Sequence, residues 1–155
     1  MINVTFVCLG NICRSPMAEF IFKNIVEERG LARSFHISSC ATSSEEVGNP
    51  VYPPAVRELA RHGISGTHRA RRMSINDAVE NDYILVMDES NLTNVLRLTG
   101  GKYKEKIFKL CSFTDNPRDV ADPWYTRDFE RAFNDISEGC NGFLEYLLRE
   151  RKEKF

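Results

Sequence analysis

The first sixteen residues constrain the fold most strongly, because a strand, a tight turn and a helix start follow one another without a spacer. Residues 3–9 are mostly β-branched or apolar, which predicts a strand. Gly10 permits a turn or a close backbone approach, and Ser15-Pro16 predicts a helix start with Ser15 at the N-cap. Such a unit places the strand end beside a helix N-terminus, where free N–H groups and the helix dipole favour an anion.

The alternation of strands and helices continues along the chain. Further strands are expected at 35–39, 83–87 and 107–110, and helices at 16–29, about 54–61, 75–81, about 90–99 and from residue 129 onward. The run at 83–87 is continuously apolar, as in a strand that is covered on both faces. This order predicts one α/β domain over residues 1–155, with an open four-stranded parallel sheet and helices on both faces.

Apolar stripes predict which helix faces are buried. The helix from about residue 54 is expected to turn Val56, Leu59 and Ala60 inward. The last helix carries one long stripe, consisting of Phe129, Ala132, Phe133, Ile136, Cys140, Phe143, Leu144 and Leu147. This stripe predicts a long amphipathic helix at the end of the chain.

Composition limits the partners. The net charge of −1 leaves no basic footprint for nucleic acid, and the basic cluster at 68–72 is short enough to be a solvated loop. No stretch approaches the roughly 20 apolar residues of a membrane span, and no signal-peptide pattern opens the chain. The five cysteines show neither an even disulfide framework nor zinc spacing. We therefore expect a cytoplasmic protein without metal or other cofactor, with export without a signal peptide as the open alternative.

Cys8 and Arg14 are six positions apart, a spacing that lets a backbone loop wrap around one tetrahedral oxyanion. The thiolate would lie beneath the anion, and the planar guanidinium could pair with two of its oxygens. A helix N-terminus and a nearby cation favour a thiolate, and the Ser15 hydroxyl could donate to the sulfur. None of the other four cysteines has an arginine six positions on. The pattern predicts phosphoryl transfer through a cysteine nucleophile, against the alternative of a buried structural cysteine.

Such a reaction also needs an acid, and Asp122 is the strongest candidate. Pro123 restricts Asp122 to an extended conformation, and Trp124 and Tyr125 could form a wall against a substrate ring. A plain turn is the alternative for this segment. The other candidates for the acid are Asp115, Asp119 and Asp128.

Together, residues 8–16 and 122–125 closely resemble the low-molecular-weight protein tyrosine phosphatases, and the resemblance covers essentially the whole chain. Further matching segments are 47–50, 62–64, 68–71 and 87–92. The resemblance implies a flavodoxin-like topology, with the phosphatase loop after the first strand. It also implies metal-independent hydrolysis of phosphotyrosine, in proteins or in small aryl phosphates. A monomer is expected, with a weak dimer as the alternative.

The resemblance also implies roles for single residues. Cys8 would attack phosphorus and form a cysteinyl-phosphate, while Asp122 would protonate the leaving tyrosine and then activate water. Arg14 would hold the equatorial oxygens together with the loop amides, from a substrate-binding loop consisting of Leu9, Gly10, Asn11, Ile12 and Cys13.

Supporting roles follow from the same resemblance. Asn11 would brace the loop in a hydrogen-bond network with Ser39 and His68, and Ser15 would stabilise the thiolate. Cys13 matches a family cysteine that forms a reversible disulfide with the nucleophile, which would protect it from irreversible oxidation.

One departure from the family pattern concerns specificity. Many members carry an aromatic residue at the pocket mouth where this chain has Glu45, followed by Glu46. Our hypothesis is that these carboxylates repel dianionic substrates and favour basic residues beside the phosphotyrosine.

Three other functions remain open. Arsenate reductases share the fold and the loop, but Cys40, Cys111 and Cys140 form no recognisable disulfide-relay pair. Protein-arginine phosphatases favour threonine where Ile12 stands and smaller residues after the Asp-Pro, whereas an apolar slot of Ile12, Trp124 and Tyr125 suits phosphotyrosine. A phosphopeptide-binding or thiol redox module is the non-enzyme alternative.

Overall fold

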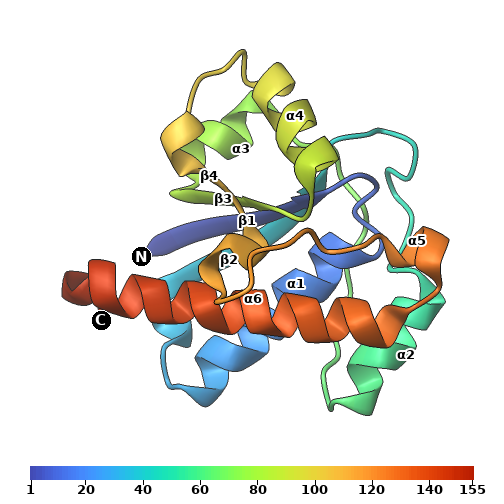
Figure 1. Cartoon of the computed structure of the whole chain (residues 1–155), viewed down its shortest axis with the longest axis horizontal. Helices are drawn as coiled ribbons and strands as arrows, with labels where there is room; N and C mark the ends of the chain where they lie inside the picture. Colours follow the sequence, from blue (N-terminus) through green and yellow to red (C-terminus); the bar gives the residue numbers. More distant parts are fainter.

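The computed structural model describes residues 1–155 and shows a parallel four-stranded sheet between two layers of helices (Figure 1). The strands are β1 (Ile2–Cys8), β2 (Phe35–Ala41), β3 (Tyr83–Val86) and β4 (Ile107–Lys109), and they lie in the order β2-β1-β3-β4. Every neighbouring pair is parallel, with Val4 opposite both Ile37 and Tyr83. The predicted single-domain α/β architecture is confirmed.

The helices divide between the two faces of the sheet. Figure 1 shows α1 (Arg14–Glu28), α2 (Pro53–Arg61) and α6 (Phe129–Glu150) below the sheet, and α3 (Ile75–Glu80) and α4 (Glu89–Leu98) above it. Short elements complete the chain: the helix α5 (Pro123–Thr126) and the 3₁₀ turns Ala32–Ser34, Lys104–Lys106, Leu110–Phe113 and Lys152–Lys154. None of these helices is long and apolar enough to cross a bilayer.

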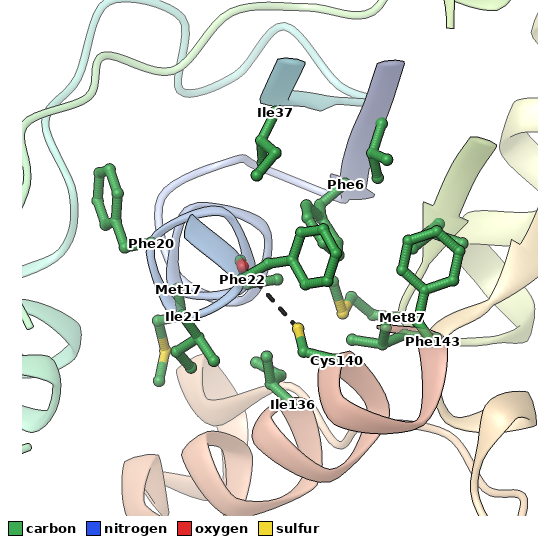
Figure 2. Close-up of a cluster of buried hydrophobic side chains, with 14 of the residues drawn as sticks. Phe6, Met17, Phe20, Ile21, Phe22, Ile37, Met87, Ile136, Cys140 and Phe143 are labelled. Atoms are coloured by element: carbon green, nitrogen blue, oxygen red, sulfur yellow. Dashed lines mark hydrogen bonds between the residues drawn. The ribbon is translucent and has the colours of Figure 1, made fainter. Parts of the chain in front are cut away.

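The larger core lies between the sheet and the pair α1 and α6. Phe22 of α1 packs edge-on against Phe6 of β1 at 5.9 Å and at a tilt against Phe143 of α6 at 5.5 Å between ring centroids. Figure 2 shows these rings meeting beside Cys140, whose thiol points toward the carbonyl oxygen of Ala18. All eight residues of the predicted α6 stripe are buried. This core fixes α1, and with it the loop that joins α1 to β1.

Helix α1 begins at Arg14, so the predicted start at Ser15-Pro16 is wrong by two positions. Cys13 occupies the N-cap and makes no side-chain capping bond. Ser15 lies inside the helix, because its hydroxyl bonds the side chains of Cys8 and Asn11 instead of the helix backbone. At the other end, Gly30 has φ +71°, which permits the C-terminal bonds Leu31 N–H to Val26 O and Gly30 N–H to Glu27 O.

The predicted inner face of α2 is partly wrong. Leu59 is buried as predicted, but Val56 is 44% exposed and Ala60 is also exposed. The buried face is completed instead by Ala55 and Glu58. Glu58 is only 2% exposed; Arg61 pairs with its carboxylate at 2.8 Å, and His62 Nε2 lies 3.0 Å from it. Glu58 can therefore lie on the buried face of α2 because it is ion-paired, which a prediction from hydrophobicity alone does not take into account.

Helix α6 approaches the turn 110–113 closely at Gly142. A Cβ added there would overlap the carbonyl oxygen of Phe113. We expect Gly142→Ala to lower the free energy of unfolding by about 1–3 kcal/mol, although alanine is the better helix former. The neighbouring exposed change Asn141→Ala should stay within about 0.5 kcal/mol. Urea unfolding of both variants measures the difference, and equal stabilities would show that α6 can shift at no cost.

Candidate active site

A hollow of about 140 Å³ opens where β1 ends and α1 begins. Its lining contains Cys8, Leu9, Gly10, Asn11, Ile12, Cys13, Arg14, Glu45, Glu46, Asp122, Trp124 and Tyr125. Apart from Ser15, Ser39 and His68, every predicted site residue lines this hollow, and those three contact the loop by hydrogen bonds. The site lies where the strand order reverses between β1 and β3, the usual ligand position in open α/β sheets.

The Cys8 sulfur is surrounded by hydrogen-bond donors. It accepts the backbone N–H groups of Asn11 at 3.3 Å and Ser15 at 3.4 Å, and it lies 3.0 Å from Ser15 Oγ. The Asn11 amide donates to Ser15 Oγ at 2.7 Å, so the Ser15 hydroxyl proton is left to point at the sulfur. These three donors stabilise negative charge on Cys8.

Asn11 is the central residue of the loop. It is fully buried and adopts the left-handed conformation, with φ +62°. Its carbonyl oxygen accepts from Arg71 N–H at 3.1 Å and lies 2.6 Å from His68 Nε2, while its amide donates to Ser15 and to Ser39 at 3.0 Å. The side chain therefore ties the loop to β2 and to the segment 68–71.

The network ends in a buried carboxylate that the sequence analysis did not identify. The Ser39 hydroxyl donates to Glu19 at 2.6 Å, and Glu19 is only 6% exposed. Lys23 Nζ compensates its charge at 2.6 Å; His68 Nδ1 lies 3.7 Å away, and burial lowers the pKa of His68 below its ordinary value. The spacing of Glu19 and Lys23 on one helix was the available signal, but it is typical of any exposed helix face.

Arg14 is buried and held by oxygen atoms from two segments. Its Nη1 donates to Asp88 and to the carbonyl of Val120, both at 2.7 Å, and Nη2 lies 3.5 Å from Asp122. Burial opposes the charge, but Cys8, Asp88 and Asp122 together raise the pKa of Arg14 above its ordinary value. The guanidinium is thus a fixed cation at the wall of the hollow.

Asp88 is a second residue that the sequence analysis missed as a site member. It follows β3 and caps α4 by accepting the N–H of Asn91 at 2.8 Å. A polar residue at the carboxyl end of the strand beside β1 was the signal that could have found it.

Asp122 lies at the N-cap of α5, as expected of a residue before proline. One carboxylate oxygen accepts the N–H of Trp124 at 3.0 Å, and the other faces Arg14. Trp124 is 43% exposed and packs on Tyr52 at 4.8 Å between centroids, whereas Tyr125 is 75% exposed. The two rings therefore form an open rim of the hollow, in which Trp124 is held by Tyr52 and Tyr125 extends into solvent.

The other thiols differ from Cys8 in their surroundings. Burial, and next the charge of Cys8, raise the pKa of Cys13 to about 12, and burial likewise raises the pKa of Cys40 to about 12. All five cysteines are free thiols. No group of His, Cys, Asp or Glu side chains is arranged to hold a metal ion. A charge-stabilised sulfur, a fixed guanidinium and a carboxylate around one small hollow can together perform nucleophilic displacement on a tetrahedral oxyanion.

Substitutions at Asn11 separate its hydrogen bonds from its backbone conformation. We expect Asn11→Gly to lower the free energy of unfolding by about 1–3 kcal/mol, because buried partners lose their bonds. Asn11→Ala should cost about 1 kcal/mol more, since alanine is strained in the left-handed conformation. Denaturant unfolding of both variants measures the two contributions. Wild-type stability in the glycine variant would contradict the central role of the side chain.

Comparisons with known proteins identify the family of the chain. The family model described as low molecular weight phosphotyrosine protein phosphatase matches residues 3–153. The chain is 37% identical to the low molecular weight protein-tyrosine-phosphatase YfkJ of Bacillus subtilis, over 98% of this chain and 99% of that protein. It is 39% identical to the human low molecular weight phosphotyrosine protein phosphatase, over 92% and 94% of the two chains.

Solved structures show the same likeness. The crystal structure of YfkJ superposes with a TM-score of 0.92 at 38% identity, covering 97% of each chain. The Drosophila arginine phosphatase DARP superposes with a TM-score of 0.86 at 32% identity, over 92% of this chain and 96% of that one. With a family match across nearly its whole length, the chain belongs to the low molecular weight phosphotyrosine protein phosphatase family.

Proposed function

We propose that residues 1–155 act as one phosphatase domain that hydrolyses phosphotyrosine through a cysteinyl-phosphate. The observation that carries this proposal is the Cys8 sulfur, which accepts two backbone N–H groups in a hollow that Arg14 and Asp122 also line. Family membership supports the reaction class, and the named relatives support phosphotyrosine as the substrate.

In the first step the Cys8 thiolate attacks phosphorus. The S–P bond forms while the P–O bond to the tyrosine breaks, and Asp122 gives its proton to the departing phenolic oxygen. Arg14 and the N–H groups of the loop stabilise the charge on the equatorial oxygens. The fixed position of Arg14 between Asp88 and Val120 reduces the reorganisation that this stabilisation requires.

In the second step water attacks the cysteinyl-phosphate. Asp122, now ionised, accepts a proton from the water while the new P–O bond forms and the S–P bond breaks. Inorganic phosphate leaves, and the thiolate is restored with its donors from Asn11 and Ser15 in place. Ser39 and His68 act through Asn11 by holding the loop in its binding conformation.

The rim favours an aromatic phosphate ester. Ile12, Trp124 and Tyr125 give the hollow an apolar mouth that suits a phenyl ring. Phosphoarginine is the second candidate, because a neighbour of the same fold is an arginine phosphatase. We further propose a cytoplasmic, cofactor-free monomer. Cys8 and Cys13 are free thiols that line the same hollow, and a two-electron oxidant such as a peroxide would take up their two hydrogens as the disulfide forms.

Kinetics of two variants test the catalytic assignment. Cys8→Ser should abolish turnover of phosphotyrosine, because the nucleophile is lost. Asp122→Asn should lower turnover of phosphotyrosine by about 10²–10⁴-fold, and turnover of p-nitrophenyl phosphate by less, since nitrophenolate leaves readily without a proton. The matched control is Asp115→Asn, at an exposed aspartate outside the hollow, which should keep wild-type rates.

The same assay decides the substrate class. Wild type is given phosphotyrosine, phosphoserine and phosphoarginine in metal-free buffer from acidic to neutral pH. Turnover of phosphotyrosine alone supports the proposal, and preferred turnover of phosphoarginine replaces it with the second candidate. Full activity of Cys8→Ser would contradict the mechanism.

The carboxylates at the rim generate a separate test. We expect Glu45→Trp to lower the KM for small aryl phosphates about threefold, because an aromatic contact replaces a repelling charge. Glu45→Gln removes the charge alone and should produce a smaller decrease that vanishes at high salt. Steady-state kinetics at two ionic strengths measure both effects. An unchanged or higher KM in the tryptophan variant would refute the hypothesis.

A further inference from the structure

A second hollow, of about 310 Å³, adjoins the active-site hollow and shares Leu9 with it. Its lining comes from β1's end, the loop after β2, the segment before α3 and the last turns of α4, and consists of Leu9, Thr42, Ser43, Arg72, Asn94, Arg97 and Leu98. Two arginines and no carboxylate contribute to this surface. The second hollow is thus positively charged, opposite to Glu45 and Glu46, which line the active-site hollow.

The polar groups of the second hollow have unused donors. The Ser43 oxygen accepts the N–H of Glu45 at 3.1 Å, which leaves the hydroxyl proton free. The Asn94 oxygen accepts from Arg97 Nη1 at 3.2 Å, which leaves the Asn94 amide hydrogens free. Such a set of groups, with its acceptors occupied and its donors free, is suited to an anion.

Two further residues of the second hollow have unsatisfied hydrogen-bonding groups. The Arg72 side chain is exposed and makes no hydrogen bond or ion pair within the protein. The Thr42 hydroxyl is the one buried side-chain oxygen or nitrogen in the chain without a partner. An oxyanion in the hollow would supply acceptors for the Arg72 guanidinium that the protein itself does not provide.

The second hollow is fixed relative to the catalytic loop. Thr42 N–H donates to the carbonyl of Cys8, and Ser43 N–H donates to that of Leu9, both at 3.0 Å. An extended peptide advances roughly 3.5 Å per residue, so a few residues of substrate reach from one hollow to the other across Leu9.

We propose that Arg72 and Arg97 form a subsite for an oxyanion carried by the substrate chain near its phosphotyrosine. The ligand is the carboxylate of an aspartate or glutamate, or a second phosphate. The proposal rests on the proposed function and extends it, because the two charged surfaces fix the direction of the peptide. An acidic flank lies toward Arg72 and Arg97, and a basic flank lies toward Glu45 and Glu46.

Phosphotyrosine peptides test the subsite. A set with one glutamate scanned over the three positions on each side is compared with the all-alanine peptide. At one position we expect wild-type kcat/KM to exceed that of the alanine peptide by about fivefold to tenfold, and less at high salt. The double variant Arg72→Gln/Arg97→Gln should lose this preference and keep its rate on p-nitrophenyl phosphate.

A matched control removes the same charge elsewhere. Arg33→Gln/Arg149→Gln changes two exposed arginines outside both hollows and should retain the preference. Phosphoserine in place of glutamate distinguishes the two ligand sources: a stronger preference assigns the subsite to a second phosphate, and an equal or weaker one assigns it to a carboxylate.

The outcomes also separate this inference from the proposed function. Normal turnover of p-nitrophenyl phosphate with no preference for any glutamate peptide would overturn the subsite alone, as would a preference that persists in Arg72→Gln/Arg97→Gln. If wild type turned over no ester, the catalytic proposal would fail. Calorimetric binding of the same peptides to Cys8→Ser, with and without the two arginine changes, would then decide the subsite independently.

Discussion

The rest of the site depends on the hydrogen bonds that the buried carboxamide of Asn11 makes. A loop that ends a strand and starts a helix leaves several N–H groups directed at its centre, and no secondary structure fixes their direction. Asn11 fixes it by bonding Ser15 in the helix, Ser39 in β2 and the backbone of Arg71. The left-handed backbone of Asn11 is maintained because these partners hold the side chain. The same bonds leave the Ser15 hydroxyl proton for the sulfur.

The buried charge of Arg14 is likewise held in place by hydrogen bonds to other segments. A guanidinium that is 2% exposed is costly unless it is paired, and Asp88 and the carbonyl of Val120 provide the pairing at 2.7 Å. The contact with Asp122 is longer, at 3.5 Å. A bound phosphoryl group can therefore displace Asp122 from Arg14 without disturbing the two bonds that hold the arginine. In the proposed mechanism, the displaced Asp122 carboxyl group would be the one that transfers the proton.

The sequence predicted the features that depend on local pattern. The apolar run at 83–87 and the stripe of α6 became a buried strand and a buried helix face, because periodicity reports burial directly. The predictions failed where a tertiary partner changed the use of a side chain. Ser15 was assigned both to the N-cap and to a bond with the Cys8 sulfur; the bond is present, but the cap is not, because Asn11 also engages the hydroxyl inside the helix. Val56 and Ala60 were assigned to the inner face of α2, but the packing of the folded helix buries Ala55 and Glu58 instead.

The site residues that the sequence analysis missed also depend on contacts between segments that are distant in the chain. Asp88 and Glu19 act through Arg14 and Ser39, which are 74 and 20 positions away in the chain, and no local signal links them. The proposed nucleophile Cys8 and the anion-binding Arg14 lie within one continuous loop and were predicted from their spacing, whereas Asp122 comes from a distant segment and was proposed from its place before Pro123. Residues that define the surroundings of the loop come from separate segments, so the fold has to be known before their roles can be assigned.

The surroundings of the catalytic loop also explain how one reaction can serve different substrates. The loop from Cys8 to Arg14 lies between β1 and α1, and the N–H groups of Asn11 and Ser15 fix the surroundings of the Cys8 sulfur, the proposed nucleophile. The flanking surfaces carry Glu45 and Glu46 on one segment and Arg72 and Arg97 on two others. These side chains make few bonds to the core, so their charge can change without loss of the fold. The proposed selectivity for the flanks of a phosphotyrosine would therefore be physically separable from the chemistry at its phosphate.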